Sequence, residues 1–151
     1  MGGIPYYRQG KEWNCGAAAM RMVLQALGFR KSEKELARLL GTSKKSGTRN
    51  KAFAELGEKL KLNYCVKRKS SLKELEKMLD EGWLVILGYF LEKEKEGHYA
   101  VVEKISKGKI FLLDPKLGKG TNYSLKHFGR IWKNNPKGKD KEKKWLIAFK
   151  K

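Results

Sequence analysis

Apolar residues recur at helical spacing in three segments that occupy the first 62 residues of the chain. Residues 14–27 carry two overlapping sets of apolar positions, with Asn14 as a suitable N-cap and Gly28 as a suitable helix end. The segments "SEKELARLLG" at 32–41 and "TRNKAFAELGEKLKL" at 48–62 repeat the same spacing. The pattern predicts three helices in this part of the chain.

Strand patterns dominate the rest of the sequence. A short strand is expected at 63–68 and a fourth helix at 71–82, and a last helix, "SLKHFGRIW", is expected at 124–132. The other strands are expected at "WLVILGYFL" 83–91, "HYAVVEKI" 98–105, "KIFLLD" 109–114 and "KWLIAFK" 144–150. Helices first and strands later predict an α+β domain with a mostly antiparallel sheet.

Length and composition favour one globular domain. The chain has 151 residues, of which 40% are hydrophobic, and we expect a single domain over residues 1–151. The longest apolar run, 83–91, is too short to cross a bilayer and no signal-peptide pattern occurs, so we expect a cytoplasmic protein without a membrane segment. Two cysteines without a C-x-x-C motif predict neither a disulfide framework nor structural zinc, and no metal or cofactor is expected.

The net charge is strongly positive. Lys and Arg number 35 against 16 Asp and Glu, which gives a formal charge of +19. Such a surface attracts polyanions, including nucleic acid, acidic peptides and anionic lipid. The basic residues are scattered through every segment and form no nucleic-acid-binding motif. Weak polyanion binding is one interpretation, and a heat-adapted surface rich in Lys and Glu is the other.

The first cysteine lies where a loop is expected to become a helix. With Asn14 as N-cap, Cys15 is the first helical residue, and the unpaired N–H groups and helix dipole favour its thiolate. Gly16 is expected to keep the surroundings open. Gln9, six positions before the cysteine, is placed to give a second N–H to an oxyanion beside the N–H of Cys15. A lone cysteine is more often a small core residue, so the assignment depends on a base.

A histidine and an aspartate supply the candidate base and its orienting acid. His98 begins one expected strand and Asp114 ends the next, with "SKG" 106–108 between them as a three-residue hairpin loop. That loop pairs Ala100 with Asp114, so His98 and Asp114 share a face and lie diagonally across the ladder. A loop one residue longer would place them on opposite faces. Pro115 is expected to end the strand after the aspartate. A thiol, an imidazole and a carboxylate together are the groups of nucleophilic catalysis.

The other histidine and cysteine lack such neighbours in the sequence. His127 falls in the amphipathic segment 124–132 with no acid close by, which favours a surface or packing role. Cys65 lies in the middle of an expected strand without a capping feature, which favours the core.

These pieces, in this order, resemble the C39-like, bacteriocin-processing branch of the papain-like cysteine peptidases. The matching stretches are "YYRQGKEWNCGAAAMRMVLQALG", "SGTRNKAFAELGEKLKL", "LKELEKMLDEGWLVIL", "GHYAVVEKI" and "IFLLDPKLG". Members of the family typically carry Gln-x5-Cys-Gly at the first helix, Gly-His at the start of a strand and Asp-Pro after the next strand. The resemblance extends to about Trp132.

The resemblance implies a papain-like fold, in which an N-terminal helical half packs on a C-terminal mostly antiparallel sheet with the site in the cleft between them. It implies Cys15 as nucleophile, His98 as base, Asp114 as orienting residue and Gln9 as oxyanion donor. Many members are N-terminal domains of peptide-exporting ABC transporters and cut leader peptides after a Gly-Gly pair. This sequence departs from that pattern because it contains neither a transmembrane segment nor a P-loop.

We therefore expect a stand-alone thiol hydrolase, a cysteine peptidase that cleaves a peptide or leader-peptide substrate through an acyl-enzyme on Cys15. Two alternatives are a non-catalytic peptide-docking module of the same fold and a basic polyanion-binding protein. An acyl-enzyme resolved by an amine in place of water would make the chain a transferase. Neither the substrate's identity nor the oligomeric state has a signature in the sequence.

Overall fold

The computed structural model describes residues 3–151 and contains, within that range, five helices and a six-stranded sheet. The elements in chain order are α1 (Cys15–Ala26), α2 (Glu33–Leu39), α3 (Asn50–Lys59), β1 (Asn63–Lys67), α4 (Leu72–Asp80), β2 (Leu84–Leu91), β3 (Glu96–Ser106), β4 (Lys109–Asp114), β5 (Gly118–Ser124), α5 (Leu125–Ile131) and β6 (Leu146–Lys150). The predicted α+β class is confirmed. Strand β5 was not predicted.

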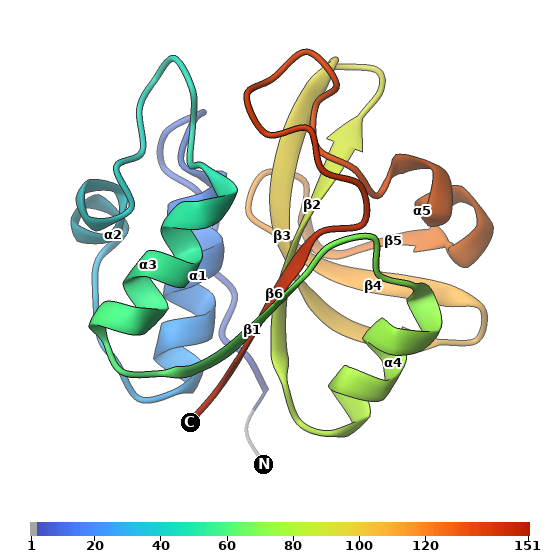
Figure 1. Ribbon diagram of the computed structural model, residues 1–151, viewed down its shortest axis with the longest axis horizontal. Coiled ribbons are helices and arrows are strands. Elements are labelled where there is room, and N and C mark those ends of the chain that lie inside the picture. Colours follow the sequence, from blue (N-terminus) through green and yellow to red (C-terminus); the bar gives the residue numbers. More distant parts are fainter. Residues whose placement is uncertain (1–2) are drawn as a thin grey trace.

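The sheet separates two groups of helices. Its strand order is β1-β6-β2-β3-β4-β5, and every neighbouring pair is antiparallel. Helices α1, α2 and α3 lie on one side of the sheet, and α4 and α5 lie on the other (Figure 1). The predicted packing of an N-terminal helical half on an antiparallel sheet is confirmed. No helix within residues 3–151 has both the length and the apolar character needed to span a membrane.

Strand β2 is buried on both faces, which explains its unbroken apolar sequence. Ile86 packs in the core formed with α1–α3, whereas Val85 and Leu87 pack in the core formed with α4 and α5. Because successive side chains of a strand point to opposite faces, a strand covered on both sides does not alternate between apolar and polar residues.

The hairpin between β3 and β4 differs from the predicted three-residue loop. Ser106 pairs with Lys109, so the turn has only two residues, Lys107 and Gly108. Their φ angles are 52° and 75°, and two positive φ values are typical of the type I′ turn that suits a tight hairpin. Taken alone, this turn would shift the pairing by one residue relative to the prediction.

A β-bulge in β3 compensates for the shorter turn. The register shifts between Val102 and Lys104, where Glu103 is the additional residue. Beyond the bulge, Val101 lies opposite Leu113, which is the pairing that the three-residue loop predicted. His98 and Asp114 therefore share one face of the sheet, although the turn alone would have separated them.

Candidate active site

A cavity of about 410 Å³ lies between the helical half and the sheet half of the protein. Cys15, the first residue of α1, and His98, the third residue of β3, both line it. Its walls come from the α2–α3 loop at residues 45–49 and from the loop before β6 at residues 134–140. These loops rise at the same end of the molecule (Figure 1). The fold thus brings the predicted thiol and the predicted imidazole to one opening.

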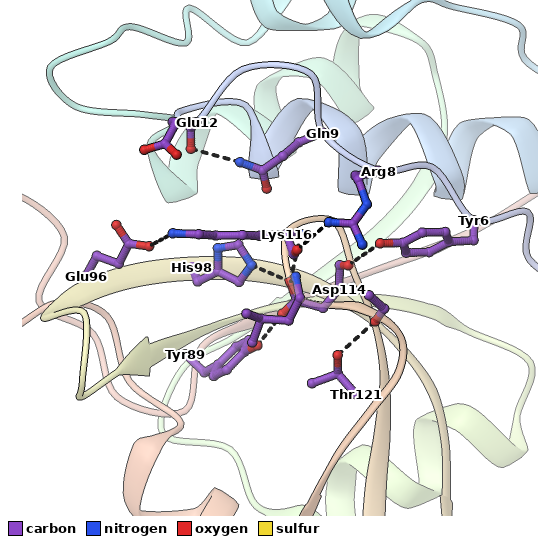
Figure 2. A network of polar contacts seen from close by, with 12 residues as sticks. Tyr6, Arg8, Gln9, Glu12, Tyr89, Glu96, His98, Asp114, Lys116 and Thr121 are labelled. Atoms are coloured by element: carbon purple, nitrogen blue, oxygen red, sulfur yellow. Dashed lines mark hydrogen bonds and ion pairs between the residues drawn. The ribbon is translucent and has the colours of Figure 1, made fainter.

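The imidazole is bound to the carboxylate. His98 Nε2 lies 2.6 Å from Asp114 Oδ1, and both side chains are buried (Figure 2). Because Nε2 is occupied by Asp114, Nδ1 is the ring nitrogen left for the sulfur of Cys15. Cys15 itself is only partly buried, so a substrate can reach it while the other two groups stay out of water.

The surroundings of His98 favour its protonated form. Burial alone would lower its pKa, but the negative charge of the Cys15 sulfur and the hydrogen bond to Asp114 raise the pKa to about 10. At neutral pH the ring is then an imidazolium beside the Cys15 sulfur. A cationic ring in this position favours attack by the sulfur and, in the same reaction, supplies a proton for the leaving group.

Asp114 is held as a carboxylate by several donors. Its Oδ1 accepts the backbone N–H groups of Lys116 at 2.9 Å and Leu117 at 2.8 Å, in an Asx-type turn directly after the strand. Burial would raise the pKa of Asp114, but its hydrogen bonds, above all that from His98, hold the pKa below its usual value. The carboxylate therefore stays ionised beside the ring that it orients.

Tyr89 completes the site, and it was not found from the sequence. It lies opposite His98 in the β2–β3 ladder. Its ring is edge-on to the imidazole, with 5.7 Å between the two ring centroids, and its hydroxyl donates to Asp114 Oδ2 (Figure 2). Burial and the charge of Asp114 raise its pKa, so the hydroxyl remains a donor. A usable signal existed, because a tyrosine inside a fully apolar run needs a buried partner for its hydroxyl.

The N-terminal segment runs beside the turn that follows β4. The Tyr6 hydroxyl donates to the Asp114 carbonyl at 2.6 Å (Figure 2). The backbone N–H of Gln9 donates to the Pro115 carbonyl at 3.0 Å. As predicted, Pro115 follows the last residue of β4. These contacts bring Gln9, which is far from Asp114 in the sequence, to the same side of the site.

The side-chain amide of Gln9 is engaged with its own loop. Nε2 donates to the carbonyls of Lys11 at 3.0 Å and Glu12 at 2.9 Å, and Oε1 is buried without a partner. The sequence predicted an amide free to donate to an oxyanion. In this structure a substrate oxygen would have to replace one of the two carbonyls.

Glu33, at the start of α2, fixes the loop that leads into Cys15. Asn14 is at the N-cap position as predicted, but its side chain does not cap α1 and instead donates from Nδ2 to Glu33 Oε2 at 2.9 Å. The same carboxylate accepts the backbone N–H of Gly10 with both oxygens, at 3.0 and 2.9 Å. The loop before the cysteine is thus tied to the second helix.

Gly16 does not leave open space beside the cysteine, contrary to the prediction. A Cβ at this position would lie 2.6 Å from Thr48 Oγ1 and 2.8 Å from Thr48 Cβ. The glycine is therefore required because the start of α1 packs directly against the α2–α3 loop, which forms a wall of the cavity.

Replacing Gly16 with Ala should lower the free energy of unfolding by about 1–3 kcal/mol, because the added methyl overpacks this contact. Urea unfolding followed by tryptophan fluorescence measures the change. Gly129→Ala in α5 is the matched control, since its Cβ would meet nothing within 4 Å. The control should keep or slightly raise the stability. Equal stability of the two variants would contradict the packing argument.

The remaining cysteine and histidine lie outside the cavity. Cys65, on β1, is partly buried against the core formed with α4 and α5. His127, on α5, is partly exposed, and the centroid of its ring lies 5.7 Å from that of Tyr123. Both positions agree with the predicted core and packing roles. Within residues 3–151 no group of three His, Cys, Asp or Glu side chains is placed to hold a metal ion.

The fold and this arrangement of groups define a papain-like cysteine peptidase. The profile of the peptidase C39 family matches residues 3–136. The chain therefore belongs to the peptidase C39 family.

One curated relative is the lactococcin transport/processing ATP-binding protein LcnC-like of Lactococcus lactis, 32% identical over 111 residues. The match includes 73% of this chain and 15% of the relative, so the chain spans a small part of that protein's length.

Solved structures show the same fold. The peptidase domain of Streptococcus ComA, described as a bifunctional ABC transporter involved in quorum sensing, matches with a TM-score of 0.76 and 21% identity, covering 98% of this chain and 99% of that one. A putative C39-like peptidase from Bacillus anthracis matches with a TM-score of 0.73 and 14% identity, covering 98% of this chain and 94% of that one. A double glycine motif protease from an AMS/PCAT transporter, solved in complex with the leader peptide, matches with a TM-score of 0.72 and 19% identity. The match covers 97% of this chain and 91% of that one.

Proposed function

We propose that this chain acts as a thiol hydrolase that cleaves peptide bonds through Cys15, His98 and Asp114. One observation carries the proposal: the buried His98–Asp114 hydrogen bond of 2.6 Å stands beside a cavity that Cys15 also lines. A histidine in a purely structural role needs neither an ionised buried partner nor a thiol at an opening.

The groups account for both halves of a hydrolysis. The Cys15 sulfur attacks the carbonyl carbon, and the His98 imidazolium gives its proton to the leaving amine as the peptide bond breaks. The neutral ring then takes a proton from water, whose oxygen attacks the acyl-enzyme, and the thiolate leaves. Asp114 keeps the ring oriented and stabilises its cationic form throughout.

The oxyanion is assigned two donors, the backbone N–H of Cys15 and the side-chain amide of Gln9. The N–H groups in the first turn of a helix have no intrahelical acceptor, which leaves that of Cys15 for a substrate. For Gln9, one N–H turns from the carbonyl of Lys11 or Glu12 to the substrate oxygen. The anchoring of Gln9 to Pro115 through the backbone leaves the side chain able to make that exchange.

Leader peptides with a Gly-Gly pair before the cut are the proposed substrates. Support comes from membership in the C39 family and from the similar fold of a double glycine motif protease solved with a leader peptide. The lining of the cavity also includes Gly47, Gly97 and Gly138, which leave backbone rather than side chains at those points of the wall.

The proposed function is tested with a synthetic peptide that contains one Gly-Gly pair and a twin that carries Ala-Ala instead. We expect cleavage after the second glycine and at least about tenfold slower cleavage of the twin, because added methyl groups must fit a closely packed wall. Mass spectrometry of the products identifies the cut. Binding of the Gly-Gly peptide without any cleavage would favour the docking module instead.

A further inference from the structure

Three lysines line the active-site cavity from both of its walls. Lys45 belongs to the α2–α3 loop of the helical half, and Lys137 and Lys139 belong to the loop before β6 in the sheet half. All three are exposed, and none forms an ion pair with an acidic residue in the described part of the chain, 3–151. A peptide lying in this cavity would therefore pass between unneutralised cations.

The acidic group in the lining is already used. Asp140 accepts Arg49 Nη2 on Oδ1 at 2.9 Å, and on Oδ2 it accepts Arg49 Nε at 3.1 Å and the backbone N–H of Asn50 at 2.9 Å. This two-pronged contact neutralises Asp140 and joins the two walls of the cavity. The lysine charges thus have no counter-charge within the lining.

The other side of the site has a different charge balance. There Lys116 donates to Glu96 Oε1 at 2.6 Å, and Glu12 lies on the same side, near Gln9 (Figure 2). On this side a lysine is paired with a carboxylate, whereas Lys45, Lys137 and Lys139 in the cavity are not paired with one among residues 3–151.

We propose that this cavity selects peptides with Asp or Glu side chains near the bond to be cut, and that Lys45, Lys137 and Lys139 determine the preference. The inference rests on the proposed function, because it requires a peptide in the cavity. Lysines on flexible stems act as mobile point charges, so the selection is electrostatic, does not demand one fixed position of the acid and weakens with salt.

The test measures kcat/KM for a set of otherwise identical Gly-Gly peptides. One carries two Glu residues before the pair, one carries two Glu residues after it, and one carries Gln at all four positions. We expect one of the Glu peptides to be cleaved about tenfold more efficiently than the Gln peptide at about 20 mM salt, and within about twofold of it at about 0.5 M salt.

Variants locate the preference. The double variant Lys137→Gln, Lys139→Gln should lose most of the preference for Glu, measured as the ratio of kcat/KM for the Glu peptide to kcat/KM for the Gln peptide. The matched control, Lys73→Gln with Lys126→Gln, removes the same charge from exposed positions on α4 and α5 outside the cavity and should keep the preference.

Three results would overturn the inference. Equal cleavage of all three peptides by the wild type removes the acidic preference but leaves the proposed function standing. An equal loss of preference in both double variants assigns it to net charge and not to the cavity. Absence of cleavage of every peptide overturns the proposed function, and the inference with it.

Discussion

Replacing Cys15 with Ala is expected to lower kcat/KM for a Gly-Gly peptide by at least about 10,000-fold. The sulfur is the atom that forms the new bond, and the variant leaves no other nucleophile facing His98. Binding of the peptide should persist, because the walls of the cavity are unchanged. Initial rates measured by chromatography of the products, together with fluorescence anisotropy for binding, separate the two effects.

The second cysteine provides the matched control. Cys65 lies on β1 outside the cavity, so Cys65→Ala should cleave the peptide within about twofold of the wild-type rate, as surface and peripheral substitutions usually do. Wild-type turnover by the Cys15 variant on a reactive peptide would refute the assignment of the nucleophile. Loss of turnover in both variants would indicate a folding defect, which circular dichroism detects.

Local sequence patterns predicted most of the helices and strands, but they did not predict strand β5. Helices α1 and α4 have strong apolar periodicity and were predicted within one or two residues of their bounds. Strand β5, "GKGTNYS", is polar, rich in glycine and largely exposed at the edge of the sheet. It becomes a strand because β4 offers it a partner, and such tertiary pairing overrides local β-propensity.

The register that places His98 and Asp114 on one face of the sheet was predicted correctly through an incorrect turn. The sequence "SKG" suggested a three-residue loop, whereas the structure has a two-residue turn and a bulge at Glu103 whose effects on register cancel. Nothing local in the sequence marks the bulge. What constrains the outcome is burial: a slip by one residue would turn the apolar side chains of β4 from one core to the other.

The residues of the candidate site also differ in whether local sequence could identify them. Cys15, His98 and Asp114 were found because each stands at or near the end of an element with a neighbour of distinctive type. Tyr89 and Glu33 act through contacts between segments that are distant in sequence, and no spacing rule reports such contacts. The bonds of the Gln9 amide to its own loop were likewise invisible without coordinates.

The second large effect is expected at the histidine. Replacing His98 with Gln should lower kcat/KM by at least about 1,000-fold, because the leaving amine loses its proton donor and the thiol loses its base. Gln is chosen because its amide can still donate to the buried Asp114 carboxylate, which limits the loss of stability. His127→Gln, on α5 and outside the cavity, is the matched control and should retain activity.

The dependence on pH distinguishes a catalytic from a structural role for His98. Its pKa is raised from 6.5 to about 10, so the imidazolium is kept across that interval and is lost only as the pH rises through about 10. Wild-type kcat/KM should therefore fall on the alkaline side near pH 10, and not near 6.5. At about pH 5, iodoacetamide should alkylate Cys15 faster than Cys65, because the imidazolium beside Cys15 increases the reactivity of its sulfur.

In His98→Gln this difference should disappear, and Cys15 should be alkylated at a rate close to that of Cys65. Peptide mapping after alkylation reports Cys15 and Cys65 separately, so Cys65 serves as an internal reference in the same sample. Fast labelling of Cys15 at acidic pH in both proteins would show that His98 does not control the sulfur. The helix N-terminus alone would then account for the reactivity of Cys15, and the base would have to be sought elsewhere in the cavity.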